Sequence, residues 1–258
     1  MSRFGGLLIG LTVAALGTPA AAGAWTQPKG KSHVILKVEQ MTAYQGFDPN
    51  GAPVDLPARR RDAAVGVFAE YGLTDSLTLQ VKGDWQSGED AFVDFEGRGP
   101  IEIGVTWRVW REPKTAVSLY VGYADGGEGR NAGYAAPGEG DSDWEMRLSV
   151  GRNFTGGTAI SPRRSFLEGQ VARRVRQGLP DETRIDLTHG VHLGEDWLLL
   201  NQAFGGLADE NGPRWLSVES TVVRHFGNWS VQAGWRQTVA GRETPDASGP
   251  VIAFWRRF

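Results

Sequence analysis

Residues 77–85 read LTLQVKGDW, and apolar and polar side chains alternate along nearly the whole stretch. In an extended chain successive side chains point to opposite faces. Residues 77, 79, 81 and 85 therefore share an apolar face, while residues 78, 80, 82 and 84 share a polar one. This pattern predicts a β-strand with one apolar and one hydrated face.

The same alternation recurs on both sides of this stretch. Twelve runs carry it, at about 33–41, 63–73, 77–85, 101–110, 115–124, 144–154, 165–175, 183–193, 197–207, 214–225, 229–238 and 249–258. In 197–207 the consecutive Leu198, Leu199 and Leu200 leave open which face is apolar. A tilted membrane strand needs about 9–11 residues, whereas soluble strands are commonly about 5–6. The lengths of the runs favour a membrane protein.

The connections between the runs alternate in length. Joints at 74–76, 112–114, 194–196 and 227–228 are short, with 155–164 as an exception, whereas those at 42–62, 125–143, 208–213 and 240–248 are longer and polar. Short turns at one end and longer loops at the other are typical of outer-membrane barrels. The sequence thus predicts an all-β fold: a single antiparallel transmembrane β-barrel of about 12 strands, with short periplasmic turns and long external loops.

Composition excludes several classes of function. The formal net charge is −3, so there is no basic surplus for nucleic acid. The chain has no cysteine, which removes disulfides and thiolate metal sites. No acidic loop has the spacing of an EF-hand, and no glycine string has the context of a nucleotide-binding loop. We expect no cofactor and no metal site.

The N-terminus has the features of a secretory signal peptide. A positive start is followed by an apolar run over residues 7–16 and by small residues. Both Ala20–Ala22 and Ala22–Ala24 satisfy a small-x-small cleavage rule. We predict a cleaved signal peptide over residues 1–24 and a barrel over 25–258. Residues 25–31 could enter the lumen as a small plug or simply lead into the first strand.

The C-terminal run ends in Phe258, with Phe254 and Ile252 in phase with it. Aromatic residues also lie near the ends of other runs, where an interfacial girdle would need them; they are Tyr71, Trp85, Trp144, Phe154, Trp197, Trp215, Phe226 and Trp229. Residues 70–79, EYGLTDSLTL, are similar to a strand–turn–strand element of these barrels.

By these features the chain resembles Gram-negative outer-membrane β-barrel proteins. The resemblance implies an outer-membrane location, contact with lipid and lipopolysaccharide, and recognition of Phe258 by the assembly machinery. Arg256 departs from the pattern, since an apolar or aromatic residue is usual there.

The polar face is predicted to line the lumen, where function would reside. Its candidate pore-lining residues are Lys82, Asp84, Glu102, Arg108, Glu145, Arg147, Arg184, Asp186 and Arg236. Both charge signs occur, and arginine makes planar, bidentate contacts with anions. We predict a passive channel or transport protein for small solutes. Because 12 strands lie between filled 8-stranded and open 16-stranded barrels, a closed structural barrel without a pore is the alternative.

A lipid-active enzyme is a weaker alternative. Outer-membrane phospholipases resemble this chain in strand count, and they carry His and Ser two residues apart on one strand. Neither His189 nor His225 has a serine two residues on. His189 and His192 would point to opposite faces of a strand, which argues against a shared metal ion. No catalytic residue is therefore assigned.

Overall fold

The computed structural model of the chain describes residues 23–156 and 164–258. The predicted signal peptide lies outside the described residues except for Gly23 and Ala24, and so does most of the joint at 155–164. No helix in these two ranges is long and apolar enough to span a membrane.

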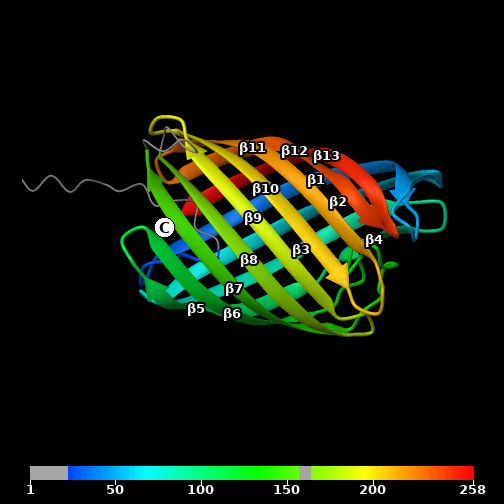
Figure 1. Cartoon of the computed structure of the whole chain (residues 1–258), viewed down its shortest axis with the longest axis horizontal. Helices are drawn as coiled ribbons and strands as arrows, with labels where there is room; N and C mark the ends of the chain where they lie inside the picture. The colour runs from blue at the N-terminus through cyan, green and yellow to red at the C-terminus, as the bar shows by residue number, and fades with distance from the viewer. Residues whose placement is uncertain (1–22, 157–163) are drawn as a thin grey trace, which may run out of the picture.

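The described residues form thirteen strands. They are β1 (Ser32–Phe47), β2 (Pro53–Thr74), β3 (Leu77–Glu89), β4 (Asp94–Arg98), β5 (Ile101–Arg111), β6 (Thr115–Asp125), β7 (Ser142–Thr155), β8 (Arg164–Gln177), β9 (Glu182–His192), β10 (Trp197–Ala208), β11 (Arg214–Phe226), β12 (Trp229–Arg242) and β13 (Thr244–Arg257). Figure 1 shows them as a barrel of tilted strands.

The sheet closes on itself. β1 pairs with both β2 and β13, and β3 pairs with both β2 and β5, so twelve antiparallel strands form a ring. β4 is an extra short strand that pairs with the second half of β3. Closure leaves no unpaired strand edge in the ring, as a lipid environment requires. The predicted fold class is confirmed.

The two ends of the barrel differ. One end, here called the short-turn end, carries the turns at 75–76, 112–114, 193–196 and 227–228. The backbones of Ser32 and Phe258 are hydrogen-bonded to each other there, so the first and last strands start and finish at this end. The opposite, long-loop end carries the connection 126–141.

The expected alternation of faces holds in the structure. In β3, Thr78 and Gln80 are buried in the interior, whereas Val81 and Trp85 are exposed on the outside. The run at 197–207 also has a defined phase: Leu198 and Leu200 point inward. They join a small apolar cluster with Phe166, Val223, Ala253 and Trp255.

Two predicted loops are partly strand instead. β1 and β2 continue to Phe47 and from Pro53, so much of 42–62 forms a paired hairpin that projects at the long-loop end (Figure 1). Likewise β12 and β13 occupy most of 240–248, with a tight turn at Glu243, whose φ is 54°. The segments carry few apolar side chains, so the hydrophobic pattern alone could not show that their backbones are paired.

Exposed aromatic side chains gather near both ends of the strands. Those toward the short-turn end are Tyr71, Trp107, Trp197, Phe226, Trp229 and Phe258, and those toward the long-loop end are Trp85, Tyr123, Trp144 and Trp235. The prediction for Trp215 was wrong. Its ring points inward beside Tyr134, at a centroid distance of 5.8 Å, because Trp215 is in phase with the buried Ser217 and Glu219.

The outward face gives a test of membrane depth. Val121 lies midway along β6 and is 47% exposed, so Val121→Arg places a charge in hydrocarbon. We expect the free energy of unfolding in lipid vesicles to fall by about 2–4 kcal/mol, as measured by denaturant titration. Phe92→Arg, in the connection between β3 and β4, is the control and should change little. Equal losses for the two variants would contradict the assigned face and depth.

Candidate functional site

The barrel interior contains a cavity of about 740 Å³ lined mainly by polar and charged side chains. Its acidic and basic lining residues, apart from His33, are Lys37, Glu39, Lys82, Asp84, Glu102, Arg130, Arg147, Glu168, Arg174, Arg184, Asp186, Glu219 and Arg236. Positive and negative groups are nearly balanced. The cavity can therefore hold water and polar solutes, but it does not have the strong single charge of an ion-selective filter.

A second cavity of about 310 Å³ lies toward the long-loop end, against Arg60, Phe95, Tyr134 and Trp215. Six residues line both cavities: Glu39, Asp84, Gln86, Arg130, Gly133 and Arg184. The two cavities meet at these residues, which we call the neck. We call the larger cavity the central cavity, and the neck lies between it and the smaller cavity.

At the short-turn end, residues 23–27 are buried or half-buried inside the barrel, and the exposed residues 28–31 connect them to β1. The Gln27 side chain donates to Glu70 at 2.8 Å, and the Gln27 N–H donates to the Thr78 hydroxyl at 2.9 Å. Thr26 donates to the Asp75 carbonyl at 2.7 Å. Of the two readings of this segment, the structure supports the plug. Its residues fill part of the lumen below the central cavity.

The Trp25 ring fixes this plug against the apolar cluster. It packs edge-to-face on Phe166, with centroids 5.9 Å apart. The ring also occupies the space beside Gly151, where any Cβ would lie only 2.3 Å from it. A larger residue at position 151 would therefore displace the plug.

At the long-loop end, the connection 126–141 folds over the lumen. Arg130 bonds to Asp62 at 3.2 Å and to Asp90 at 2.5 Å, which ties the connection to β2 and to the turn after β3. Burial alone would raise the pKa of Asp90, but the N–H groups of Phe92 and Val93 and the Arg130 guanidinium hold this pKa below its usual value. Asp90 therefore stays charged and keeps the contact at neutral pH.

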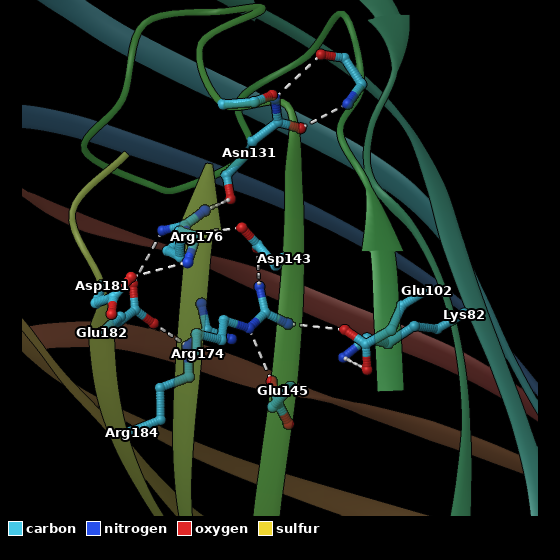
Figure 2. Close-up of polar contacts among 12 residues, drawn as sticks. Lys82, Glu102, Asn131, Asp143, Glu145, Arg174, Arg176, Asp181, Glu182 and Arg184 are labelled. Carbon is cyan, nitrogen blue, oxygen red and sulfur yellow. Dashed lines mark hydrogen bonds and ion pairs between the residues drawn. The ribbon is translucent and has the colours of Figure 1, made fainter. Parts of the chain in front are cut away.

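A ladder of buried ion pairs crosses one wall of the lumen (Figure 2). Arg174 is its centre, bonded to Glu102 and Glu145 at 2.8 Å and to Asp143 at 3.1 Å. At one end Lys82 pairs with Glu102 at 2.9 Å.

Toward the long-loop end the ladder continues through Arg176. Arg176 pairs with Asp143 at 3.0 Å and with Glu182 at 3.2 Å, and Glu182 in turn pairs with Arg184. Arg176 also donates to the Asn131 carbonyl at 2.9 Å, so the ladder supports the folded connection (Figure 2). The wall and the connection above it are therefore one bonded unit.

The opposite wall carries a smaller cluster. Arg236 pairs with Glu219 at 2.7 Å and with Glu39 at 3.3 Å, and Lys37 pairs with Glu39 at 3.0 Å. Within the described ranges, no ion pair involves the lining carboxylates of Asp84 and Asp186. Among the described side chains, Gln86 alone donates to the Asp84 carboxylate. The lumen's cations are thus mostly neutralised, while some of its carboxylates are not.

The structure separates the predicted pore-lining residues into two groups. Seven of them border the central cavity: Lys82, Asp84, Glu102, Arg147, Arg184, Asp186 and Arg236. Arg108 instead donates to Thr26 of the plug at 2.8 Å, and Glu145 is buried between Arg147 and Arg174. That the seven line a conducting pore stays a prediction.

The sequence reasoning missed Asp143, Arg176 and Glu182, which complete the ladder, and Arg130, which anchors the long connection. The alternation places Arg174 inside the barrel. Arg176 follows two residues later and so lies on the same face, which means that extending the seventh run by two residues would have identified it. Nothing in the alternation pattern could have found Arg130.

A serine and a histidine do come together in the structure, although not on one strand. The Ser230 hydroxyl lies 2.8 Å from His225 Nδ1 across the β11–β12 hairpin. A hydrolytic site also needs a group that orients the histidine ring. No described side chain makes a second hydrogen bond to the His225 ring, so the pair has no triad around it.

Comparisons with known proteins place the architecture. No family model matches the chain, and no curated protein matches it. Among solved structures, an outer membrane channel from Pseudomonas putida F1 superposes with a TM-score of 0.67 at 15% identity, over 93% of this chain and 100% of that one. The KdgM porin superposes with a TM-score of 0.56 at 5% identity, over 88% and 99% of the two chains.

The chain has the fold of the outer-membrane β-barrel channels. A third match widens this group: the translocator domain of the autotransporter NalP from Neisseria meningitidis, with a TM-score of 0.51 at 12% identity, over 90% of each chain. At such low identity the likeness concerns the barrel alone. The likeness extends over nearly the whole of each related chain.

The ion-pair ladder gives a test of what stabilises the lumen. Arg174→Met leaves Glu102, Glu145 and Asp143 without their shared cation, so we expect the free energy of unfolding to fall by about 3–5 kcal/mol. The matched control is Arg173→Met, one residue along β8, whose half-exposed side chain pairs with Asp181 and Asp209 at the rim. It should lose no more than about 1 kcal/mol. Similar losses for the two variants in a denaturant titration would show that the buried ladder has no special role.

Proposed function

We propose that the chain is an outer-membrane channel through which small polar solutes pass passively along the lumen. One observation carries the proposal: two cavities in the barrel interior, both lined by charged side chains, share the residues of the neck. Outward apolar strands bounding a charged, hydrated interior are what a solute path across lipid requires.

The proposal includes an orientation. The short-turn end faces the periplasm and the long-loop end faces outward, as is general for such barrels. Export by the N-terminal signal peptide and contact of the outer surface with lipid and lipopolysaccharide belong to the same proposal. Recognition by the assembly machinery would involve β13 and the residue after it, since Ile252 and Phe254 of β13 and the following Phe258 are exposed.

Arg256, which departs from the usual pattern, is compatible with this role. Its guanidinium group lies over the rings of Trp229, at 4.4 Å, and Phe258, at 5.1 Å. Such cation–π contacts let a charged side chain sit in an aromatic girdle at the membrane surface.

The charge pattern bears on which solutes pass. The KdgM porin has been solved with oligogalacturonate, an acidic saccharide. In this chain the arginines of the lumen are largely paired, as are Glu102, Glu145 and Glu219, whereas Asp84 at the neck and Asp186 below it are not. We therefore propose small neutral or cationic solutes rather than large anions.

A second candidate function is a structural barrel with a closed lumen. It is favoured by the plug at 23–31 and by the connection 126–141, which narrow the lumen from its two ends. A membrane enzyme finds less support, because the structural neighbours named above are described as a channel, a porin and a translocator domain.

Single-channel recording in a planar bilayer separates these functions. The mature protein should give discrete current steps with a non-zero reversal potential in a salt gradient. A chain that begins at Lys31, and so lacks most of the plug, should conduct about twofold more or better, because pore conductance grows with open cross-section. If neither protein conducts although both are folded, the channel hypothesis is wrong and the closed structural barrel is favoured. Phospholipid hydrolysis would then be the next assay.

The neck predicts the sign of selectivity. Asp84→Asn removes its one carboxylate without an ion pair, so the reversal potential should shift toward anion selectivity. Asp125→Asn is the control, since that residue is 62% exposed at the rim and pairs with Arg98. An equal shift in the control would mean that surface charge, and not the neck, sets selectivity.

A further inference from the structure

Residues 23 and 24 are bound inside the lumen as firmly as the rest of the plug. Ala24 is fully buried, and its N–H donates to Glu168 at 3.2 Å. The Gly23 carbonyl accepts a hydrogen bond from the Ser118 hydroxyl at 2.5 Å. A mature chain that started at Trp25, as the sequence alone suggests, would lose both contacts.

The space around Gly23 fits glycine and brings it against a carboxylate. Its φ is +77°, and a Cβ there would lie 2.3 Å from Gln170 Nε2 and 2.7 Å from Glu168 Oε1. The backbone nitrogen of Gly23 is bonded to the same α-carbon from which this Cβ position is built. A charged group on that nitrogen would therefore lie within a few ångströms of Glu168.

Glu168 has no cationic partner among the described residues. It is only 3% exposed, and its hydrogen-bond donors among the described residues are the Ala24 N–H and the Gln170 amide. No lysine, arginine or histidine of residues 23–156 and 164–258 forms an ion pair with it. By contrast, the equally buried Glu102 and Glu219 each pair with a cation. A buried carboxylate without a counter-charge is costly.

We infer that the exported chain is cut between Ala22 and Gly23, and that the new α-ammonium group of Gly23 forms a buried ion pair with Glu168. Water adds across the peptide bond, so that Ala22 leaves with a carboxylate and Gly23 keeps the protonated amine. The residues Ala20-Ala21-Ala22 satisfy the small-x-small rule for this bond. Processing thus creates the charge that fixes the plug, and this holds whether or not the barrel conducts.

The first test is the N-terminal sequence of the protein purified from outer membranes after expression of the full chain. Gly23 as the first residue is the expected result. Trp25, or any residue other than Gly23, would overturn the inference.

The second test measures how firmly the plug is held. Since the chain has no cysteine, Ala24→Cys provides a single thiol, and its alkylation rate reports release of the plug. Glu168→Gln in a refolded chain that begins at Gly23 should raise this rate about tenfold, as loss of a charge-assisted hydrogen bond implies. Glu112→Gln, in the exposed turn after β5, is the matched control and should leave the rate unchanged.

The charge on Gly23 can also be changed without touching Glu168. A chain that begins at Ala22, or one whose Gly23 amine is acetylated, should show the same rise in rate. Neither change should raise the rate further in the Glu168→Gln background, because the ion pair is already gone. Unchanged rates, or effects that simply add, would overturn the ion pair, and the acetylated chain gives this answer even if Glu168→Gln does not fold.

Discussion

The pairing of β1 with β13 is the interaction on which the rest of the structure depends. A sheet in hydrocarbon has no water to satisfy an open edge, so a membrane-spanning sheet must close. The register from His33–Arg257 to Phe47–Thr244 supplies this closure. Once the ring is closed, each strand has one face in lipid and one in the lumen. The same ten or so residues must therefore alternate between apolar side chains for lipid and polar side chains for the lumen.

This arrangement inverts the usual core. The apolar side chains are largely on the outside, and the tightest packing inside is polar: Glu145 and Glu182 are among the largest fully buried side chains. Most of the buried charges occur as pairs, which offsets their desolvation, and Arg174 and Arg176 are each shared between acids from neighbouring strands. The ladder therefore holds the strands of this wall together from the inside, as apolar contacts do in the core of a soluble domain.

The fold was predictable from the sequence because period-two alternation is a local property. In residues 77–85 the inward and outward side chains can be read directly, and the structure keeps that phase. Long-range features were not readable in this way. The partners of Arg174 come from β5 and β7, and only the register of those strands decides which carboxylates meet it.

The same reasoning explains the remaining misses. The inward turn of Trp215 shows that an aromatic residue near a strand end does not by itself mark a girdle. The folding of 126–141 over the lumen rests on Arg130 and Asn131, and the position of a polar loop carries no periodic signal. The alternation predicts which residues face the lumen. Which of their charges are paired depends on contacts between strands, and these are known only from the three-dimensional structure.

The plug also has a consequence for the order in which the barrel is assembled. The polar contacts of residues 23–31 go to side chains and backbone groups between Glu70 and Glu168, which belong to β2 through β8 and their turns. The polar part of this docking surface is therefore complete on an open, eight-stranded sheet, and the apolar cluster behind Trp25 is completed when β10, β11 and β13 join. The leading segment can settle there while the last five strands are still outside the ring, and it need not be threaded through a finished wall.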